Sequence, residues 1–184
     1  MKRAVDFTFA LVLCLLLAPL MLVIALAVAC TSPGGAIFRQ KRIGLGCREF
    51  TIYKFRSMVA GADKKGPYFT ASGDPRITHV GKFLRKTSLD ELPQLWNVVL
   101  GNMSLVGPRP DTPAQQAHGN PQDWTERHSV RPGITGLAQA TLRSTASPER
   151  RMELDLQYVR THTLGLDFKI LAWTLGQVVR RGSY

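Results

Sequence analysis

Two adjacent carboxylates, Asp90 and Glu91, are the residues of this chain whose types and spacing best suit chemistry on a phosphate. Neighbouring helical residues point about 100° apart, so the two acids cannot share a proton but can flank one phosphate or metal ion from two directions. One carboxylate can attack phosphorus to form an acyl phosphate, while the other holds a divalent cation. Taken alone, an acidic pair more often caps a helix and complements its dipole.

Several basic residues occur around this acidic pair in the sequence and favour a phosphate-bearing ligand. They are Lys54, Arg56, Arg76, Arg85, Lys86, Arg109 and Arg131. Neighbouring prolines hold Arg109 and Arg131 on stiff backbone, which suits a guanidinium that clamps phosphate oxygens. Each of these cations alone also fits an ordinary surface position. Gly107, Gly133 and Gly136 would let backbone approach a phosphate closely, although glycines in turns are a weak signal.

The composition narrows the class of protein. The 184 residues suit one domain plus an anchor, and 24 Lys and Arg against 13 Asp and Glu give a net charge of +11. This charge favours nucleic acid, anionic lipid or nucleotide. Sparse aromatic residues and the lack of a zinc-finger or recognition-helix pattern argue against nucleic acid. Cys14, Cys30 and Cys47 have no metal-binding spacing and weakly indicate a reducing compartment.

Residues 7–30 are almost wholly apolar and would reach roughly 36 Å as a helix, enough to cross a bilayer core. A secretory signal is a weaker alternative, because the run is long and the cleavage site is imperfect. Basic residues on both flanks place both ends in the cytoplasm by the positive-inside rule. Pro19 could bend the helix, so a re-entrant segment and a spanning helix are equally compatible with charge and proline alone.

The remaining chain predicts a small strand element and several helices. Residues 37–55 read as short strands around glycine turns, and 61–73 as a loop. Apolar residues from Leu92 onward follow helical spacing to about Leu100. A helix that starts at Leu89 or Asp90 has Pro93 in its first turn, where a proline is tolerated. Segments 107–113 and 132–136 are expected to be rigid, non-helical loops.

The C-terminal residues predict one more helix. Phe168, Leu171 and Leu175 share one face, and Trp173 could anchor the helix at a membrane interface. A helix that faces an ordinary protein core fits this pattern equally well.

Four sequence blocks together resemble the bacterial sugar transferase family, the monotopic phosphoglycosyl transferases that begin glycoconjugate assembly. The blocks are residues 54–58 (KFRSM), 87–94 (TSLDELPQ), 103–110 (MSLVGPRP) and 131–136 (RPGITG). Their order is highly specific, and the resemblance covers nearly the whole chain. Its length suggests the minimal form, without the extra spanning helices of larger relatives. Asn102 and Cys47 depart from the usual pattern, but neither matches a catalytic position.

The resemblance implies a ping-pong reaction with a UDP-sugar and polyprenyl phosphate as substrates. Asp90 resembles the nucleophile that takes the sugar phosphate and releases UMP, and Glu91 resembles the acid that supports Mg²⁺. Arg85 and Arg109 resemble phosphate contacts. Lys54, Arg56 and Arg131 resemble further parts of the site, and Pro19 matches the proline that breaks a re-entrant helix. The re-entrant alternative is favoured on this ground.

The expected fold is α/β and mostly helical. Residues 1–32 are expected to form a re-entrant membrane helix, and residues 33–184 a compact cytoplasmic catalytic domain with interfacial helices and a small strand element. The expected location is the cytoplasmic face of the bacterial inner membrane, in contact with its lipid. A monomer and a homodimer are both open. The sequence does not reveal the sugar or the pathway.

Two rival functions remain at this stage. A metal-dependent hydrolase of nucleotide sugars would use the same acids, because water can break an aspartyl phosphate, and it would turn over without lipid acceptor. A membrane-surface scaffold would use the basic residues only to attract anionic lipid, with the two acids as helix caps.

Overall fold

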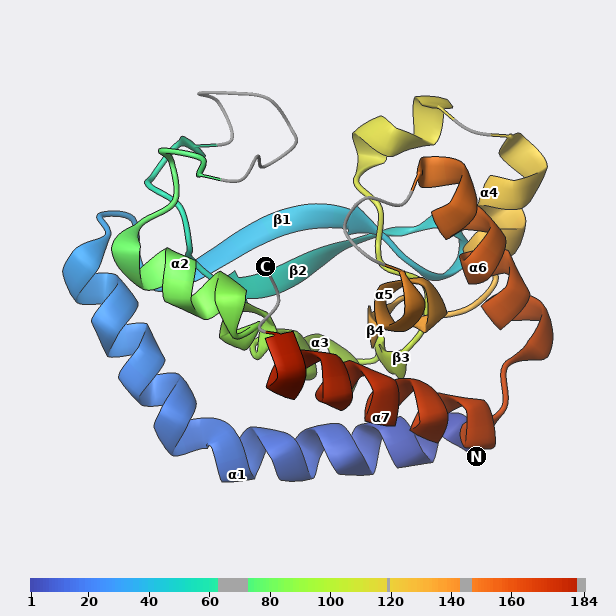
Figure 1. Cartoon of the computed structure of the whole chain (residues 1–184), viewed down its shortest axis with the longest axis horizontal. Helices are drawn as coiled ribbons and strands as arrows, with labels where there is room; N and C mark the ends of the chain where they lie inside the picture. Colours follow the sequence, from blue (N-terminus) through green and yellow to red (C-terminus); the bar gives the residue numbers. More distant parts are fainter. Residues whose placement is uncertain (63–72, 119, 143–146, 182–184) are drawn as a thin grey trace.

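The structure is a computed structural model that describes residues 1–62, 73–118, 120–142 and 147–181. In these residues helices predominate, with four short strands, so the expected mostly helical fold is confirmed (Figure 1). The long helices and the hairpin strands are α1 (Lys2–Thr31), β1 (Ile37–Ile43), β2 (Glu49–Phe55), α6 (Pro148–Thr161) and α7 (Leu164–Arg181). The shorter elements are α2 (His79–Lys86), α3 (Gln94–Val99), β3 (Ser104–Val106), α4 (Pro121–Arg127), β4 (Gly133–Thr135) and α5 (Leu137–Thr141).

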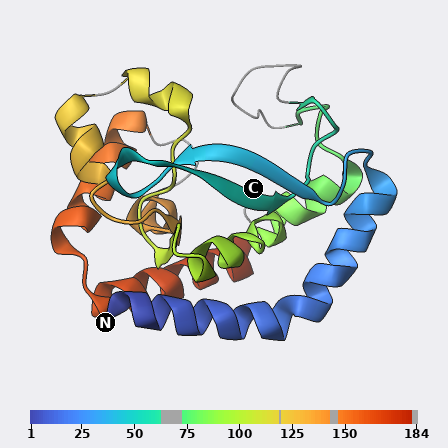
Figure 2. The same ribbon diagram turned by 180° about the vertical axis from the view of Figure 1, so that it is seen from behind.

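The apolar helix α1 is bent about half-way along its length (Figures 1 and 2). Pro19 lies inside this helix, where its ring removes one backbone hydrogen bond and accounts for the bend. Among the described residues, α1 is the one helix that is long and apolar enough to cross a membrane. Large side chains such as Leu15 and Leu16 are about 70% exposed, so most of the helix surface is apolar and uncovered by protein.

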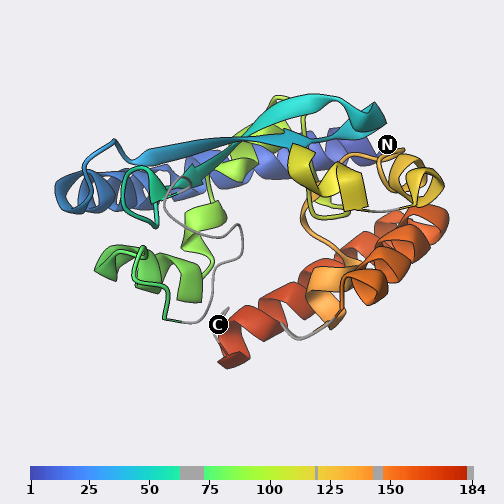
Figure 3. The same cartoon turned by 90° about the horizontal axis from the view of Figure 1, so that it is seen from above.

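Both ends of α1 pack against the rest of the same domain. Near its start, the Lys2 ammonium donates to Asp167 of α7 at 2.5 Å. Near its end, a buried cluster combines Ile24, Val28, Phe55 and Leu84. Because Phe55 ends β2 and Leu84 belongs to α2, the two arms of the bent helix are attached to different parts of one domain. Seen from above, α2 and α7 lie on the same side of α1 (Figure 3).

The β1–β2 hairpin confirms the predicted strand region. The strands are antiparallel, from the Ile37–Phe55 pair to the Ile43–Glu49 pair, and the turn between them contains Gly46 at φ 64°. Helix α3 contacts both α1 and β2, so it joins the hairpin to the long apolar helix. The apolar side chains Phe50 and Ile52 face the core from β2.

Two details of the expected elements differ from the structure. The helix expected from Leu89 or Asp90 is divided, with a 3₁₀ turn at Leu89–Glu91 before α3 begins at Gln94. Pro93 is the N-cap residue of α3, because a proline at this position removes no intrahelical hydrogen bond. Residues 132–136, expected as a loop, contain β4, which pairs with β3 in parallel. Most of the predicted 61–73 loop lies outside the described residues.

Candidate active site

A 3₁₀ turn at Leu89–Glu91 carries the two acids. Ser88, immediately before this turn, has the left-handed backbone conformation at φ 56° and makes no side-chain capping hydrogen bond. A non-glycine residue in this region costs roughly 1 kcal/mol or more and persists where the surrounding structure holds it. The acids therefore lie on a tight, strained turn.

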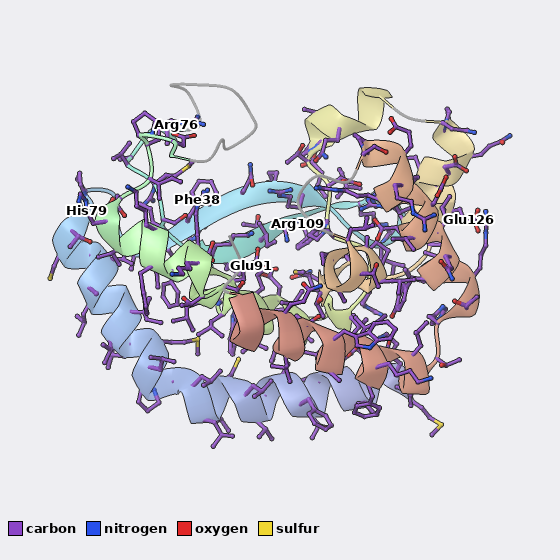
Figure 4. All side chains as sticks on the ribbon, in the orientation of Figure 1. Phe38, Arg76, His79, Glu91, Arg109 and Glu126 are labelled. Carbon is purple, nitrogen blue, oxygen red and sulfur yellow. The ribbon has the colours of Figure 1, made fainter. Side chains whose placement is uncertain are left out.

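Glu91 is held by two cations that come from distant parts of the chain, and Figure 4 labels Glu91 and one of these cations, Arg109. Its Oε1 accepts hydrogen bonds from Lys54 Nζ at 2.6 Å and from Arg109 Nη2 at 3.1 Å. Burial opposes ionisation of Glu91, but Lys54 and then Arg109 outweigh this effect and hold its pKa at about 2. Glu91 is therefore a permanent anion at neutral pH.

Asp90 has the opposite electrostatic environment. Its carboxylate is 9% exposed and accepts no hydrogen bond from the residues that the structure describes. Burial, followed by the charge of Glu91, raises the pKa of Asp90 to about 6, although Lys54, Arg85 and Arg109 partly offset the increase. At neutral pH Asp90 is therefore mostly ionised, poorly solvated and close to three cations, which is a suitable state for a nucleophile.

Arg85 is brought to this site by a close contact between α2 and the segment after β2. A side chain at Gly81 would place its Cβ 2.0 Å from the backbone oxygen of Ser57, so only glycine permits this approach. The Arg85 Nε–H then donates to Ser57 Oγ at 2.9 Å. Arg85 thus joins Lys54 and Arg109 around the acids, although no sequence pattern singled out Ser57.

Arg56 and Arg131, the other two cations that the family resemblance implied, contact backbone elsewhere. Arg56 donates to the carbonyl oxygens of Gly35 at 2.9 Å and Gly34 at 2.7 Å, directly after α1. Arg131 Nε–H donates to the Gly101 carbonyl oxygen at 2.9 Å, after α3. Both arginines therefore hold connecting segments in this structure. Their expected contacts with substrate stay predictions.

The glycines suggested as phosphate approaches lie where two backbone segments come close together. A Cβ on Gly107 would lie 2.4 Å from the Arg131 carbonyl oxygen, and one on Gly133 would lie 2.1 Å from the Gly107 nitrogen. The backbones of the two proline-containing segments are therefore in direct contact with each other. This contact places residues 108–110, the Arg109 turn, beside the β3–β4 pair.

The oxygens of the two carboxylates are of the type that binds Mg²⁺. Both protein contacts to Glu91 are made by Oε1, so Oε2 and the Asp90 oxygens are the carboxylate atoms without a hydrogen bond from the described residues. Mg²⁺ commonly binds one or two carboxylates together with substrate phosphates and water. No group of three or more His, Cys, Asp or Glu suited to a metal is found in the described parts of the chain.

Sequence reasoning missed a buried ion cluster behind the Arg109 turn. Arg127 of α4 is 6% exposed and forms ion pairs with Asp111 and Asp155, while its Nη2–H donates to the Arg109 carbonyl oxygen at 2.7 Å. The signal that the sequence offered was Asp111, an acid directly after Pro110. The partners are too far apart in the chain for any local pattern to pair them.

Comparisons with known proteins identify the family to which the chain belongs. The family model described as "Bacterial sugar transferase" matches residues 1–181. A UDP-glucose:undecaprenyl-phosphate glucose-1-phosphate transferase of Escherichia coli (strain K12) is 43% identical over 182 residues, which are 95% of this chain and 39% of that protein. A UDP-N-acetylgalactosamine-undecaprenyl-phosphate N-acetylgalactosaminephosphotransferase of Aeromonas hydrophila is 40% identical, over 97% of this chain and 43% of that protein.

A relative of similar length was also found. The exopolysaccharide production protein PSS of Rhizobium leguminosarum bv. phaseoli is 41% identical over 194 residues, which cover all of this chain and 97% of that protein. The chain thus spans well under half of the Escherichia coli and Aeromonas relatives and nearly all of the Rhizobium relative.

Proposed function

Because this chain belongs to the bacterial sugar transferase family, we propose that it transfers a sugar 1-phosphate from a UDP-sugar to polyprenyl phosphate and releases UMP. This would be the first membrane step of glycoconjugate synthesis. The observation that carries the proposal is the acid pair with divided roles. Asp90 accepts no hydrogen bond from the described residues, whereas Glu91 is fixed by Lys54 and Arg109. The names of the relatives support undecaprenyl phosphate as the acceptor.

The first half reaction uses Asp90 as the nucleophile. An oxygen of its carboxylate attacks the sugar-bearing phosphorus, the bond from this phosphorus to the bridging oxygen breaks, and UMP leaves with the bond electrons. An acyl phosphate on Asp90 remains. The raised pKa of about 6 leaves Asp90 ionised at neutral pH while burial keeps the carboxylate poorly solvated.

The second half reaction restores the enzyme. A phosphate oxygen of polyprenyl phosphate attacks the same phosphorus, and the Asp90 carboxylate is the leaving group. The product is a polyprenyl diphosphate sugar. Each step exchanges one oxygen–phosphorus bond for another, so no oxidant is required. Lys54, Arg85 and Arg109 supply the positive charge that stabilises the extra negative charge at phosphorus.

Mg²⁺ is proposed as the cofactor. It would be held by Glu91, with Asp90 adjacent, and when bound it neutralises charge on the diphosphate of the substrate. Because Lys54 and Arg109 fix Glu91 through a single oxygen, the second oxygen is kept in a constant position for the ion. Arg109, which donates a hydrogen bond to Glu91, would also contact the diphosphate of the substrate.

We also propose that residues 1–32 enter and leave the same leaflet as a re-entrant helix, with residues 33–184 on the cytoplasmic face of the inner membrane. The bend at Pro19 and the attachment of both ends of α1 to one domain support this topology. A straight spanning helix would separate these ends by a bilayer. Exposed apolar residues on α2, α3 and α7 support contact with the interface. They are Phe83, Trp96, Leu100, Phe168, Trp173 and Leu175.

The test is UMP release from a panel of UDP-sugars with Mg²⁺, with and without undecaprenyl phosphate. The panel should include UDP-glucose and UDP-N-acetylgalactosamine, since relatives are named for both. We expect multiple turnovers only with lipid, and no release by Asp90→Asn. Asp123→Asn is the matched control, because Asp123 is also an acid in the first turn of a helix, α4. Sustained release without lipid would instead identify a hydrolase, and full activity of Asp90→Asn would exclude the covalent mechanism.

A further inference from the structure

The turn that carries Arg109 is held almost entirely through its carbonyl groups. Pro108 and Pro110 have no N–H group, so this turn can donate few backbone hydrogen bonds of its own. Four consecutive carbonyl oxygens instead accept hydrogen bonds from donors on other segments. The pairs are Pro108 with Gly133 N at 2.9 Å, Arg109 with Arg127 Nη2 at 2.7 Å, Pro110 with Arg42 Nη1 at 2.9 Å, and Asp111 with Ile43 N at 2.8 Å.

Of these four donors, Arg127 is itself fixed by two acids. Its guanidinium is 7% exposed and pairs with Asp155 of α6, through a hydrogen bond of 2.9 Å from Nε, and with Asp111 at the end of the turn. One side chain thus connects α4, α6 and the turn. Loss of one partner from a buried ion pair typically costs several kcal/mol, so this connection is expected to persist during turnover.

The Arg109 side chain needs such support from its backbone. Its side chain is 49% exposed, whereas the Glu91 side chain that it contacts is 19% exposed. Packing therefore covers only half of Arg109, and the direction of its guanidinium depends on how firmly the backbone beneath it is held. A displacement of about 1 Å at a catalytic group can reduce the rate by as much as 100-fold.

We propose that Arg127 is a positioning residue that acts through Arg109. By holding the Arg109 carbonyl oxygen and the Asp111 carboxylate, it keeps the Arg109 guanidinium directed at Glu91 and at the substrate diphosphate. This inference rests on the proposed function for its kinetic consequence. The contact between Arg127 and the turn does not depend on that function.

A double-mutant cycle tests the proposal. Arg127→Lys keeps the positive charge but cannot reach both acids and the carbonyl oxygen together, because it lacks the planar fork of donors. We expect roughly a 10- to 100-fold lower kcat for UMP release than in the parent. In an Arg109→Ala background the same substitution should change kcat less than about twofold, because the residue through which it acts is gone. Equal losses in both backgrounds would overturn the proposal.

Two further variants separate positioning from loss of folding. Arg160→Lys is the matched control, since Arg160 pairs with Glu126 on the surface between the same two helices, α4 and α6, but does not contact the turn. It should keep the parent kcat. If Arg127→Lys does not fold, Asp155→Asn offers a milder change that keeps the side-chain volume. It should show a smaller loss of kcat that again disappears in the Arg109→Ala background; a loss that persists there would contradict the proposal.

Hydrogen exchange gives a readout that is independent of activity. We expect faster exchange of the Asp111 and Thr112 amides in Arg127→Lys than in the parent, with unchanged exchange in α3. Unchanged exchange at the turn would overturn the proposal even if kcat fell. If the parent released no UMP from any sugar, the proposed function would fail, while the exchange result would still decide whether Arg127 holds the turn.

Discussion

At the scale of single residues, two neighbouring acids differ because Glu91 accepts hydrogen bonds from cations, whereas Asp90 accepts none from the described residues. Glu91 Oε1 contacts Lys54 and Arg109, and the pKa of Glu91 is about 2. Asp90 is buried beside this anion, and its pKa is about 6. Two carboxylates with pKa values pushed apart can take different roles in one reaction. Here Asp90 suits the role of nucleophile, and Glu91, which stays ionised, suits the role of a ligand for a cation.

The first prediction concerns the pH dependence of the reaction. Asp90 must be ionised to attack phosphorus, so kcat/KM for the UDP-sugar should rise with pH, with its midpoint at about pH 6, and level off at higher pH. Glu91 stays ionised throughout this range and should add no second step. UMP release measured between about pH 5 and pH 8.5, with Mg²⁺ constant, checks this expectation. A profile without any rise across pH 6 would contradict the role of Asp90 or its raised pKa.

The second prediction concerns stability at the same residue. The pKa of Asp90 rises from 3.8 to about 6 in the folded protein, so the folded state binds this proton more tightly than the unfolded state. The resulting stability is fully present below about pH 4 and is lost as pH rises through 6. The free energy of unfolding of Asp90→Asn at pH 7.5 should therefore be about 1 to 3 kcal/mol higher than that of the parent. The variant should thus be more stable although it is inactive.

Denaturant unfolding in detergent at two pH values measures this difference. Near pH 4 the parent and Asp90→Asn should have similar stability, because the parent is then protonated at Asp90. The surface variant Asp123→Asn serves as the control at both pH values. A parent that is as stable as Asp90→Asn at pH 7.5 would show that the fold does not oppose ionisation of Asp90.

At the scale of elements, the junction between α3 and β2 sets the distance between Lys54 and the acids. Asn97 of α3 is fully buried and bridges the outer edge of β2. Its Nδ2–H donates to the Thr51 carbonyl oxygen at 2.7 Å, and its Oδ1 accepts from the Tyr53 backbone N–H at 3.0 Å. The strand that carries Lys54 is thereby joined to the helix that follows Glu91.

The third prediction is that Asn97→Leu destabilises the protein by about 2 to 4 kcal/mol. Leucine has nearly the same size but leaves two buried backbone groups of β2 without partners, each at a cost of about 1 to 3 kcal/mol. Thermal unfolding measures the change, with Gln157→Leu as the control at an exposed amide of α6. An unfolding temperature equal to that of the control would mean that the bridge contributes little.

At the scale of the whole molecule, α1 and the domain depend on each other. Polar contacts hold the first turn, where Arg3 donates to the carbonyl oxygens of Val98 and Val99 at the end of α3. Apolar contacts of Ile24 and Val28 hold the other end. These contacts bring both ends of an apolar helix to one domain. In the proposed topology, the acid site would therefore lie close to the membrane surface.

The fourth prediction concerns this topology. In a background without Cys14, Cys30 and Cys47, single cysteines at Ala4 and at Pro33 should both react with a membrane-impermeant thiol reagent from the cytoplasmic side alone. Both positions are exposed in the structure and lie at opposite ends of α1. Labelling of sealed cells and of inside-out vesicles gives the comparison. Reaction of the two cysteines from opposite sides would require a spanning helix.

The sequence by itself determined the parts of this protein that depend on local pattern. An unbroken apolar run predicts α1, alternating residues around glycines predict the β1–β2 hairpin, and four short blocks identify the family and name Asp90 and Glu91. Such features can be read from sequence because helix and strand periods act over a few residues. The 3₁₀ turn at Leu89–Glu91 was less predictable, since it depends on the strained backbone of Ser88.

Only the tertiary structure decided which charges meet. Lys54 pairs with Glu91 across 37 positions of sequence, and Arg127 pairs with Asp155 across 28. Arg56 and Arg131 resembled the other cations in sequence, yet they hold backbone carbonyl groups. Charge attraction acts through space rather than along the chain, so the role of each cation follows from the path of the backbone. The same path buries Asp90 and exposes half of Arg109, and both properties are absent from any local pattern.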